Sequence, residues 1–347
     1  MEIDESRIIR EGEISSWWLG PLRQQLWAEA PFEDEGMTIT RVHARTDVFA
    51  GFTGSDSQVE NLAFLMPRGT LSGLARSEND PTRIQLACSV YVHDSIMSWL
   101  PEFLGMCSLL QLIEAYSYLE VEESLELRLD RTPHPKLGHI EYRDDALEEI
   151  ILQIVAAGTQ VSRFIGDDMR ALLGDCQNPP CVLATGEDVG VTAEFPFLGR
   201  TSLTRFSAIE KNPKVGSGLL ITLKIPDKPA NGVMHALEMN ECELKYLTRS
   251  HFLGSWCSTN DGTPTFASFV PNAIWKPGLA QYLMQSMMMR AMWVAEAVYG
   301  DDWAAGGYQQ AMEQKSAMLD LFTGHSGTQT KPNRTGFLSR LFKKGGR

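Results

Sequence analysis

The sequence predicts an α+β fold of two tandem domains, each an antiparallel sheet packed against helices in helix, strands, helix order. Three observations lead to this prediction. A chain of 347 residues exceeds the usual size of one compact core. Its 43% hydrophobic and 22% charged content is typical of globular proteins. A turn, a strand and a long helix also recur in the same order, starting near residues 71 and 252.

The repeat is clearest in its turns. Residues 71–82 read LSGLARSENDPT and residues 252–263 read FLGSWCSTNDGT, so Gly, Ser, Asn, Asp and Thr coincide. Asn-Asp-Pro and Asn-Asp-Gly favour turns, because Asx side chains hydrogen-bond to nearby backbone and glycine accepts a positive φ. Each copy therefore predicts a β-hairpin.

A strand and an apolar helix follow each turn. The first strand alternates cleanly, with its apolar face at Ile84, Leu86, Cys88, Val90 and Val92, and the second, over residues 263–270, alternates less regularly. Helices are predicted over residues 98–119 and 277–299. The matching order favours duplication over chance similarity. One misfit remains, since residues 62–66 and 242–246, interpreted as the preceding strands, are out of phase.

The other elements complete two domains, predicted over residues 1–140 and 141–322. In the first, a helix rich in tryptophan is predicted over residues 14–29, followed by strands from about Met37 and no evident short middle helix. The second is predicted to open with one long amphipathic helix from Asp144 to Gly174. Strands are then predicted over residues 182–195, 202–209 and 219–225, and a short helical turn over residues 231–237.

Residues 323–347 are predicted to be a flexible basic tail. The stretch 324–336 is polar and rich in glycine and threonine, and residues 337–344, FLSRLFKK, form a small basic amphipathic patch. A disordered, solubilising end is the favoured interpretation. The alternative is weak contact with an anionic lipid, a partner groove or the protein's own acidic surface.

This order of elements resembles the type III secretion chaperone-like fold, including the bacterial YbjN-like family. Residues 268–298 look like the strand, proline-containing turn and long apolar helix that end such domains. The resemblance covers most of residues 10–300 as a pattern, without a diagnostic residue string. It implies a noncatalytic protein-binding or regulatory module, often dimeric, whose two units here would pack as a pseudo-dimer. It carries no binding residue over to this chain.

Charge and composition exclude several classes of function. A net charge of -13 and a pI near 5.1 argue against a nucleic-acid-binding protein, which needs a positive face. The most apolar stretch, residues 277–289, is interrupted by Arg290 and is too short for a membrane-spanning helix, so no stable membrane insertion is expected. The acidic N-terminal residues lack the pattern of an export signal, and six scattered cysteines favour reduced thiols in a cytoplasm.

The sequence predicts no catalytic, cofactor-binding or metal site. Cys176 and Cys181 are interpreted as loop thiols, because no second ligand pair accompanies them. His134 and His139 lie in a proline-containing connector without a helical face. The glycines of VGSG at residues 215–218 precede a strand, whereas phosphate loops follow one. Five methionines between residues 284 and 292 are interpreted as core rather than as a partner groove.

Together these observations favour a noncatalytic, cytoplasmic protein-binding protein of chaperone-like or regulatory type, whose partner is another protein. No cofactor is expected, and a pseudo-dimer or homo-oligomer fits the repeat. The alternative is a small-molecule-responsive regulator or enzyme with its site between the two repeats, where pockets often form.

Overall fold

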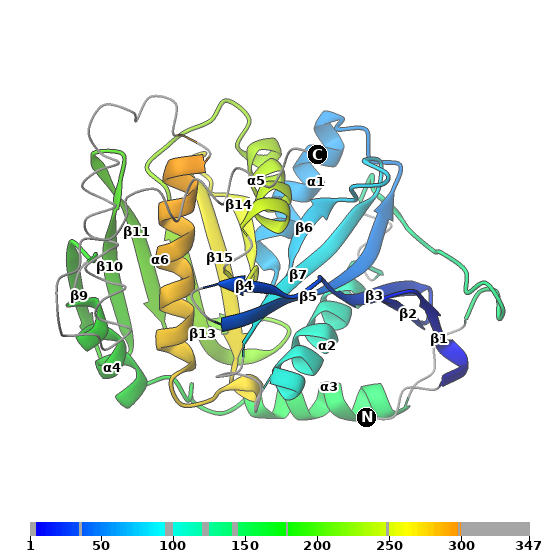
Figure 1. Cartoon of the computed structure of the whole chain (residues 1–347), viewed down its shortest axis with the longest axis horizontal. Coiled ribbons are helices and arrows are strands. Elements are labelled where there is room, and N and C mark those ends of the chain that lie inside the picture. Colours follow the sequence, from blue (N-terminus) through cyan, green and yellow to red (C-terminus); the bar gives the residue numbers. More distant parts are fainter. Residues whose placement is uncertain are drawn as a thin grey trace.

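The computed structural model describes residues 5–34, 37–93, 100–119, 125–140, 145–177, 180–247, 250–297 and 299. They form two antiparallel sheets with helices packed against them (Figure 1). The predicted α+β class, with two tandem sheet-and-helix domains, is confirmed. No helix among the described residues combines the length and the apolarity needed to cross a bilayer.

The first unit contains a sheet in the order β1-β2-β3-β5-β7-β6, with β4 and β8 each paired to β5. A short 3-10 turn, η1 (Glu5–Arg7), leads into it, and a second, η2 (Met66–Arg68), follows its first helix. The strands and helices are β1 (Ile8–Glu11), β2 (Ile14–Leu19), β3 (Leu22–Ala28), β4 (Phe32–Asp34), β5 (Met37–Ala50), α1 (Asp56–Leu65), β6 (Gly73–Arg76), β7 (Ile84–Val92), α2 (Leu100–Leu119) and β8 (Arg128–Leu129).

The second unit contains a sheet in the order β9-β10-β11-β13-β15-β14, with β12 paired to β13. Two helices precede this sheet, and a short turn, η5 (Asn272–Ile274), precedes the last helix. The elements are α3 (Asp145–Gly158), α4 (Asp167–Cys176), β9 (Leu183–Glu187), β10 (Gly190–Phe197), β11 (Arg200–Ser207), β12 (Lys211–Asn212), β13 (Gly216–Lys224), α5 (Gly232–Tyr246), β14 (Ser255–Ser258), β15 (Pro264–Pro271) and α6 (Leu279–Ala297).

The two units share one connectivity. In each, four strands lie side by side in chain order, a helix follows (α1 or α5), and a hairpin then adds to the sheet through its second strand. A long apolar helix, α2 or α6, comes next, and even the short strands β4 and β12 pair with the fourth strand of their own sheet. Apart from β8 in the first unit and the two helices that precede the second sheet, the order and connections agree, as one folding unit used twice would produce.

The units meet through equivalent contacts. The two hairpins can be aligned so that the pair Gly73 and Ala87 matches the pair Ser255 and Ala267. In this alignment Thr70 corresponds to Phe252, and Ser89 corresponds to Phe269. The amides of Ser89 and Phe252 donate to each other's carbonyl oxygens at 3.0 and 2.9 Å. The amide of Phe269 donates to the carbonyl oxygen of Thr70 at 3.0 Å, which is the matching contact. The arrangement is therefore pseudo-twofold.

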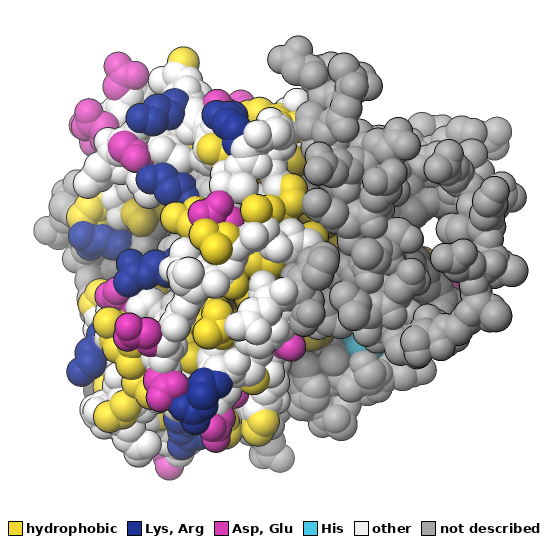
Figure 2. All heavy atoms as spheres, turned by 90° about the vertical axis from the view of Figure 1, so that its left-hand side faces the viewer, with side chains coloured by type: hydrophobic (Ala, Val, Ile, Leu, Met, Phe, Trp, Pro, Cys, Tyr) yellow, Lys and Arg dark blue, Asp and Glu magenta, His cyan; other side chains and the backbone are white. Residues whose placement is uncertain are grey.

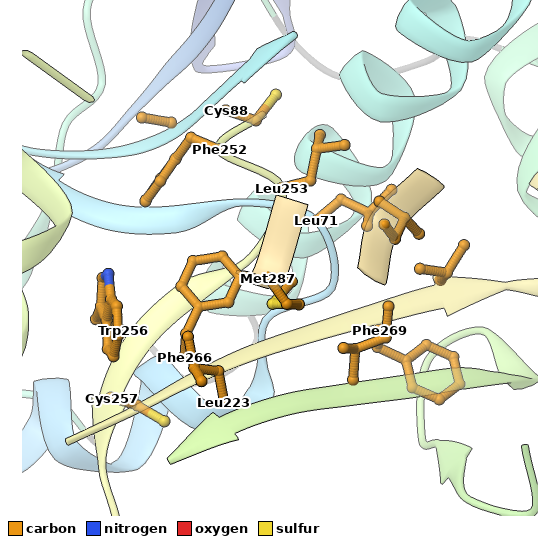
Figure 3. Close-up of a cluster of buried hydrophobic side chains, with 14 of the residues drawn as sticks. Leu71, Cys88, Leu223, Phe252, Leu253, Trp256, Cys257, Phe266, Phe269 and Met287 are labelled. Carbon is orange, nitrogen blue, oxygen red and sulfur yellow. The ribbon is translucent and has the colours of Figure 1, made fainter. Parts of the chain in front are cut away.

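Apolar side chains from both units fill the boundary. Leu71 and Cys88 of the first unit lie beside Phe252, Leu253 and Phe266 of the second (Figure 3), within one continuous core. At Gly73 an added Cβ would lie 2.7 Å from the Phe252 ring and 2.8 Å from the carbonyl oxygen of Gly254, so the close approach requires glycine there. The boundary is a packed core where the described residues meet.

The helix predicted over residues 14–29 is wrong, because this stretch forms the hairpin of β2 and β3. Gly20 and Pro21 make its turn, with Gly20 at a φ of 54° and Leu19 paired with Leu22. A glycine with positive φ followed by a proline, which clashes with the preceding turn of a helix, favours a turn over a continuous helix. The tryptophans are strand residues instead.

The strands assigned to residues 62–66 and 242–246 are also wrong, since the first stretch is the end of α1 and the start of η2, and the second lies in α5. The side chain of Ser55 caps α1 by accepting a hydrogen bond from the amide of Gln58, and Asn231 caps α5 in the same way through Met234. The misfit in the repeat disappears, because each stretch belongs to the helix before the hairpin. The missing middle helix of the first unit is α1.

The single helix predicted from Asp144 to Gly174 is two helices, α3 and α4. The side-chain amide of Asn272, which is fully buried, donates to the carbonyl oxygens of Ala157 and Val161 and accepts from the amide of Arg163. Gly158 also contacts the backbone of Val215, where a Cβ would lie 1.9 Å from the carbonyl oxygen. Tertiary contacts therefore end a helix that the apolar periodicity continues.

Replacing Asn272 by alanine is expected to lower the free energy of unfolding by about 1–3 kcal/mol, because buried backbone groups lose their partners. Urea denaturation followed by circular dichroism measures this loss. The control is N231A, which removes one exposed capping bond and is expected to cost about 1 kcal/mol or less. Equal losses in the two variants would contradict this explanation of the helix end.

α3 contacts both units. Ile151 packs against the cluster of Trp17, Leu19, Leu109 and Leu112 in the first unit, while the carboxyl end of α3 lies against β13 in the second. Figure 1 shows α3 running from the second sheet towards α2. The first part of the helix predicted to open the second domain, α3, therefore links the two units.

The remaining predicted elements lie close to their observed positions. α2 and α6 begin and end within two residues of their predicted bounds. The stretch 182–195 divides into the hairpin of β9 and β10, and the short turn at 231–237 is the first half of α5. The basic tail at 323–347 lies outside the described residues.

Candidate functional site

A buried ion pair lies where α5 and α6 of the second unit meet. Glu243 and Arg290 are 1% and 0% exposed, with Nη2 of Arg290 2.5 Å and its Nε 2.7 Å from Oε1 of Glu243. The indole of Trp256 donates to Oε2 of Glu243 at 2.7 Å. The Arg290 guanidinium also donates to the carbonyl oxygen of His251 at 2.6 Å and lies 3.7 Å from the centre of the Phe266 ring. The carboxylate is satisfied on both oxygens.

Arg41 of β5 connects the first unit to this cluster. Its guanidinium donates to the carbonyl oxygens of Leu244 at 2.7 Å and Glu243 at 3.3 Å, in the last turn of α5. Carbonyls at the end of a helix lack partners within the helix and carry its partial negative charge, so a buried cation is favourable there. Burial lowers the pKa of Arg41, opposed by Glu29 and Glu243.

His251 extends the cluster as a neutral group. Its Nδ1 accepts from the amide of Tyr91 at 3.0 Å, so its proton lies on Nε2, which contacts the hydroxyl of Tyr282. Burial lowers the pKa of His251 to about 3, with Arg290 adding to the effect. The cluster joins the units through satisfied, buried contacts and presents no open chemical group.

A second polar cluster lies beneath the first sheet, between β3, β5 and α2. The side-chain oxygen of Gln111 accepts from Gln24 at 3.0 Å and from Thr46 at 2.7 Å, and its amide donates to Ser72 and to the carbonyl oxygen of Ala44, both at 3.1 Å. Every polar atom of this side chain has a partner. The cluster therefore fixes α2 on the sheet, as fully satisfied buried networks do.

The outer face of the first sheet carries aromatic and charged residues. Trp27 stacks on His43, with ring centres 4.7 Å apart, and the Arg45 guanidinium lies 4.8 Å from the Trp27 ring centre. Nε2 of His43 is 2.7 Å from Oε1 of Glu29, and this bond lowers the pKa of Glu29. Burial lowers the pKa of His43 and of Arg45. Nδ1 of His43 and Nε of Arg45 are buried without a partner among the described residues.

The outer face of the second sheet is more open. Neighbouring strands place side by side, on this face, Leu183 of β9, Glu194 of β10, Leu203 of β11 and Lys224 of β13. Leu183 is 54% and Leu203 is 41% exposed, and Val182 and Ile209 are also exposed. Figure 2, which faces the side on which β9 and α4 lie, shows apolar side chains interspersed with charged ones.

The opposite face of these strands is buried against helices. Val191, Ala193 and Phe195 of β10 and Phe206 of β11 are at most 2% exposed, and α4 and α6 contact β10. The outer face becomes buried only at β15, where Phe269 meets the first unit. Four strands of the second sheet thus carry an outer face that no described helix covers.

The residues singled out in the sequence stay apart. His134 is buried against Trp18, with ring centres 4.6 Å apart, whereas His139 lies elsewhere on the same loop. Gly216 and Gly218 serve packing, since a Cβ at Gly218 would lie 2.2 Å from the carbonyl oxygen of Val270. Among the described residues no three His, Cys, Asp or Glu side chains gather as metal ligands.

The five methionines of α6 are buried or partly buried, in agreement with their interpretation as core residues. Met284, Met287 and Met288 of α6 are at most 4% exposed, while Met289 and Met292 are partly buried. Of the two cysteines interpreted as loop thiols, Cys176 is the buried last residue of α4, whereas Cys181 lies in the loop before β9, where its thiol donates to the carbonyl oxygen of Leu183 at 3.2 Å. The sequence did not predict the cluster of Arg41, Glu243 and Arg290. The one sequence feature that pointed to it was Arg290, a charged residue inside an otherwise apolar helix.

Comparisons of the chain with protein-family models, with curated proteins and with solved structures gave no match. The geometry of the sheets and clusters is therefore the basis for assigning a function.

Proposed function

We propose that this chain is a noncatalytic, chaperone-like protein-binding module, and that it holds an extended segment of another protein on the outer face of its second sheet. The proposal includes the kinship with type III secretion chaperone-like and YbjN-like proteins that the order of elements implies. The observation that carries it is the exposed row of Leu183, Glu194, Leu203 and Lys224.

The composition of this face suits a peptide. Exposed leucines on neighbouring strands offer apolar contacts, while Glu194, Arg205 and Lys224 offer charges of both signs between them. Apolar anchors within a polar surround are the usual anatomy of a protein interface.

The edge strand adds a second mode of attachment. β9 pairs with β10 on one side, and no described strand pairs with its other side. An unpaired strand edge accepts an extended segment through main-chain hydrogen bonds, and neighbouring side chains then give specificity. Val182, 57% exposed, and Leu183 lie at the start of this edge.

The packed boundary between the units favours a peptide-binding face on the second sheet over a ligand site between the repeats. Leu71, Phe252 and Phe269 occupy the place where a cleft would have to open. The polar groups nearby, including Glu243 and Arg290, are already bonded to one another.

The test is the double variant L183D/L203D. Peptides selected from a random displayed library against the full chain are labelled, and their binding is measured by fluorescence anisotropy. Two buried carboxylates within the docked interface are expected to weaken binding at least about tenfold, equivalent to about 1.4 kcal/mol. Stability is expected to change by less than about 0.5 kcal/mol per site, because Leu183 and Leu203 are surface residues, 54% and 41% exposed.

The control is L137D, which places one such charge at a leucine 52% exposed on the loop that packs against Trp18. It is expected to bind the selected peptides as the unchanged chain does. Failure of the library to yield any binder, or an equal loss in L137D, would overturn the proposal.

A further inference from the structure

Four side chains form a cluster on the outer face of the first sheet: Trp27 and Glu29 from β3 and its end, and His43 and Arg45 from β5. The rings of Trp27 and His43 are stacked, with centres 4.7 Å apart and planes 9° from parallel. The Arg45 guanidinium lies 4.8 Å from the centre of the Trp27 ring. His43 is 2% exposed, whereas Trp27 and Arg45 are half-buried, so solvent reaches the cluster from their side.

The second unit carries uncharged residues at the equivalent positions of this cluster. The strand pairings of the two sheets match Arg45 with Thr222, His43 with Leu220 and Trp27 with Ser207. The repeated strands therefore fold without an arginine, a histidine or a tryptophan in these places. The folding unit does not require the cluster, and a different role has to explain its partly buried charge.

Arg45 is a cation without a carboxylate partner. Its neighbour Arg23 is bonded to Asp47, and Arg41 donates to carbonyl oxygens at the end of α5. Arg45 forms no ion pair with a described residue, and its Nε is buried there without a hydrogen-bond partner. Burial lowers the pKa of Arg45, which reflects the cost of keeping the charge out of water. A bound anion would offset this cost.

His43 supplies an acceptor beside this cation. Its Nε2 lies 2.7 Å from Oε1 of Glu29, and this bond lowers the pKa of Glu29, so Nε2 carries the proton and the carboxylate accepts it. Burial lowers the pKa of His43, so the ring is neutral at pH 7 and Nδ1 carries a lone pair. This atom is buried and has no donor among the described residues. A buried polar atom without a partner calls for a water, an ion or a ligand.

The charges around the cluster select the kind of anion. Glu29, Asp47 and Glu78 are the acids that act on the charge of Arg45, and all three would repel an added negative charge. A carboxylate brings one negative charge, whereas a phosphate monoester brings nearly two, so a carboxylate is favoured. The acceptor on His43 adds a second requirement, which is a hydroxyl group next to the carboxylate.

We propose that Arg45 and His43, covered by Trp27, form a binding site for a small carboxylate that carries a neighbouring hydroxyl group. The guanidinium donates charge-assisted hydrogen bonds to the carboxylate, and the ligand hydroxyl donates to Nδ1 of His43. The Trp27 ring lies against both side chains and has to turn for a ligand to reach the buried atoms. The site is separate from the peptide-binding face proposed above, which lies on the second sheet.

The test is a titration of the isotope-labelled full chain with lactate at pH 7, followed by NMR. The reporter is the indole N–H signal of Trp27, assigned as the indole signal that W27S loses. Lactate at millimolar concentrations is expected to shift this signal until it saturates. Propionate, which lacks the hydroxyl, and lactamide, which lacks the charge, are each expected to bind at least about tenfold more weakly.

Two threonine variants show whether Arg45 itself holds the ligand. R45T introduces the residue that the second unit has at the equivalent position and is expected to weaken lactate binding at least about tenfold. The control R205T makes the same change at an arginine whose side chain is 59% exposed on the outer face of the second sheet. It is expected to bind lactate as the unchanged chain does.

The comparison of the three ligands on the unchanged chain keeps the test decisive if R45T does not fold, which circular dichroism checks. A Trp27 signal that lactate does not shift would overturn the proposal. Propionate or lactamide binding as tightly as lactate would do the same, as would an equal loss of binding in R45T and R205T.

Discussion

Replacing Glu243 by alanine is expected to lower the free energy of unfolding by about 3–5 kcal/mol, because the change leaves a buried charge on Arg290 without its partner. The indole of Trp256 would also lose its acceptor. Water cannot compensate, since both members of the pair are at most 1% exposed. Urea denaturation followed by tryptophan fluorescence and circular dichroism measures the loss.

The control is E241A, two residues away on the same helix. Glu241 pairs with Arg76 at 2.6 Å, but each side chain is at least a quarter exposed, so its loss is expected to cost at most about 1 kcal/mol. The double variant E243L/R290M removes both charges and is expected to be more stable than E243A. Equal stability of E243A and E241A would show that the buried pair does not have the role assigned to it.

Local patterns predicted the parts of the fold that local chemistry determines. The turns at Asp80 and Asp261 are formed by the expected Asx bonds, because each carboxylate accepts from the amide of the threonine two residues on. The alternation from Ile84 onward predicted β7. In these places the residue types and the tertiary contacts favour the same conformation.

Tertiary contacts explain the failures. Asn272 ends α3 by donating to the carbonyl oxygen of Val161, a residue 111 positions away in the chain. No local sequence pattern near Val161 indicates this contact. The stretch around Leu62 is short and apolar, and the stretch around Leu244 alternates apolar with charged residues; over five residues, neither pattern distinguishes a strand from a helix segment. Their capping residues, Ser55 and Asn231, were the usable indication.

The candidate sites could be predicted even less, because they arise from contacts between distant elements. Arg41 meets the end of α5 only when the two units pack, and it lies on a strand where an arginine usually indicates a solvent-facing position. The open face of the second sheet depends on which helices cover it, which the alternation of β10 and β11 does not reveal.

Replacing Phe252 by alanine is expected to destabilise both units, by about 3–5 kcal/mol, because this fully buried ring fills the boundary between them. Its ring lies against Gly73 and 6.1 Å from the centre of Phe266, and its backbone pairs with Ser89. The cavity would therefore open against β6, which pairs with β7 in the sheet of the other unit.

Hydrogen exchange followed by mass spectrometry distinguishes this shared role from an ordinary core role. F252A is expected to lower the protection of β7 amides as much as that of β14 and β15. The matched control, F195A, removes a ring 1% exposed within the second unit, and its loss of protection is expected to be larger in β10 and β11 than in β7. Ser89 of β7 and Phe252 form two backbone hydrogen bonds with each other, so a disturbance at residue 252 is expected to reach the β7 amides directly. Undiminished protection of β7 in F252A would mean that each unit is stable independently of the other. The reciprocal backbone contacts would then hold the units together without making the stability of one depend on the other.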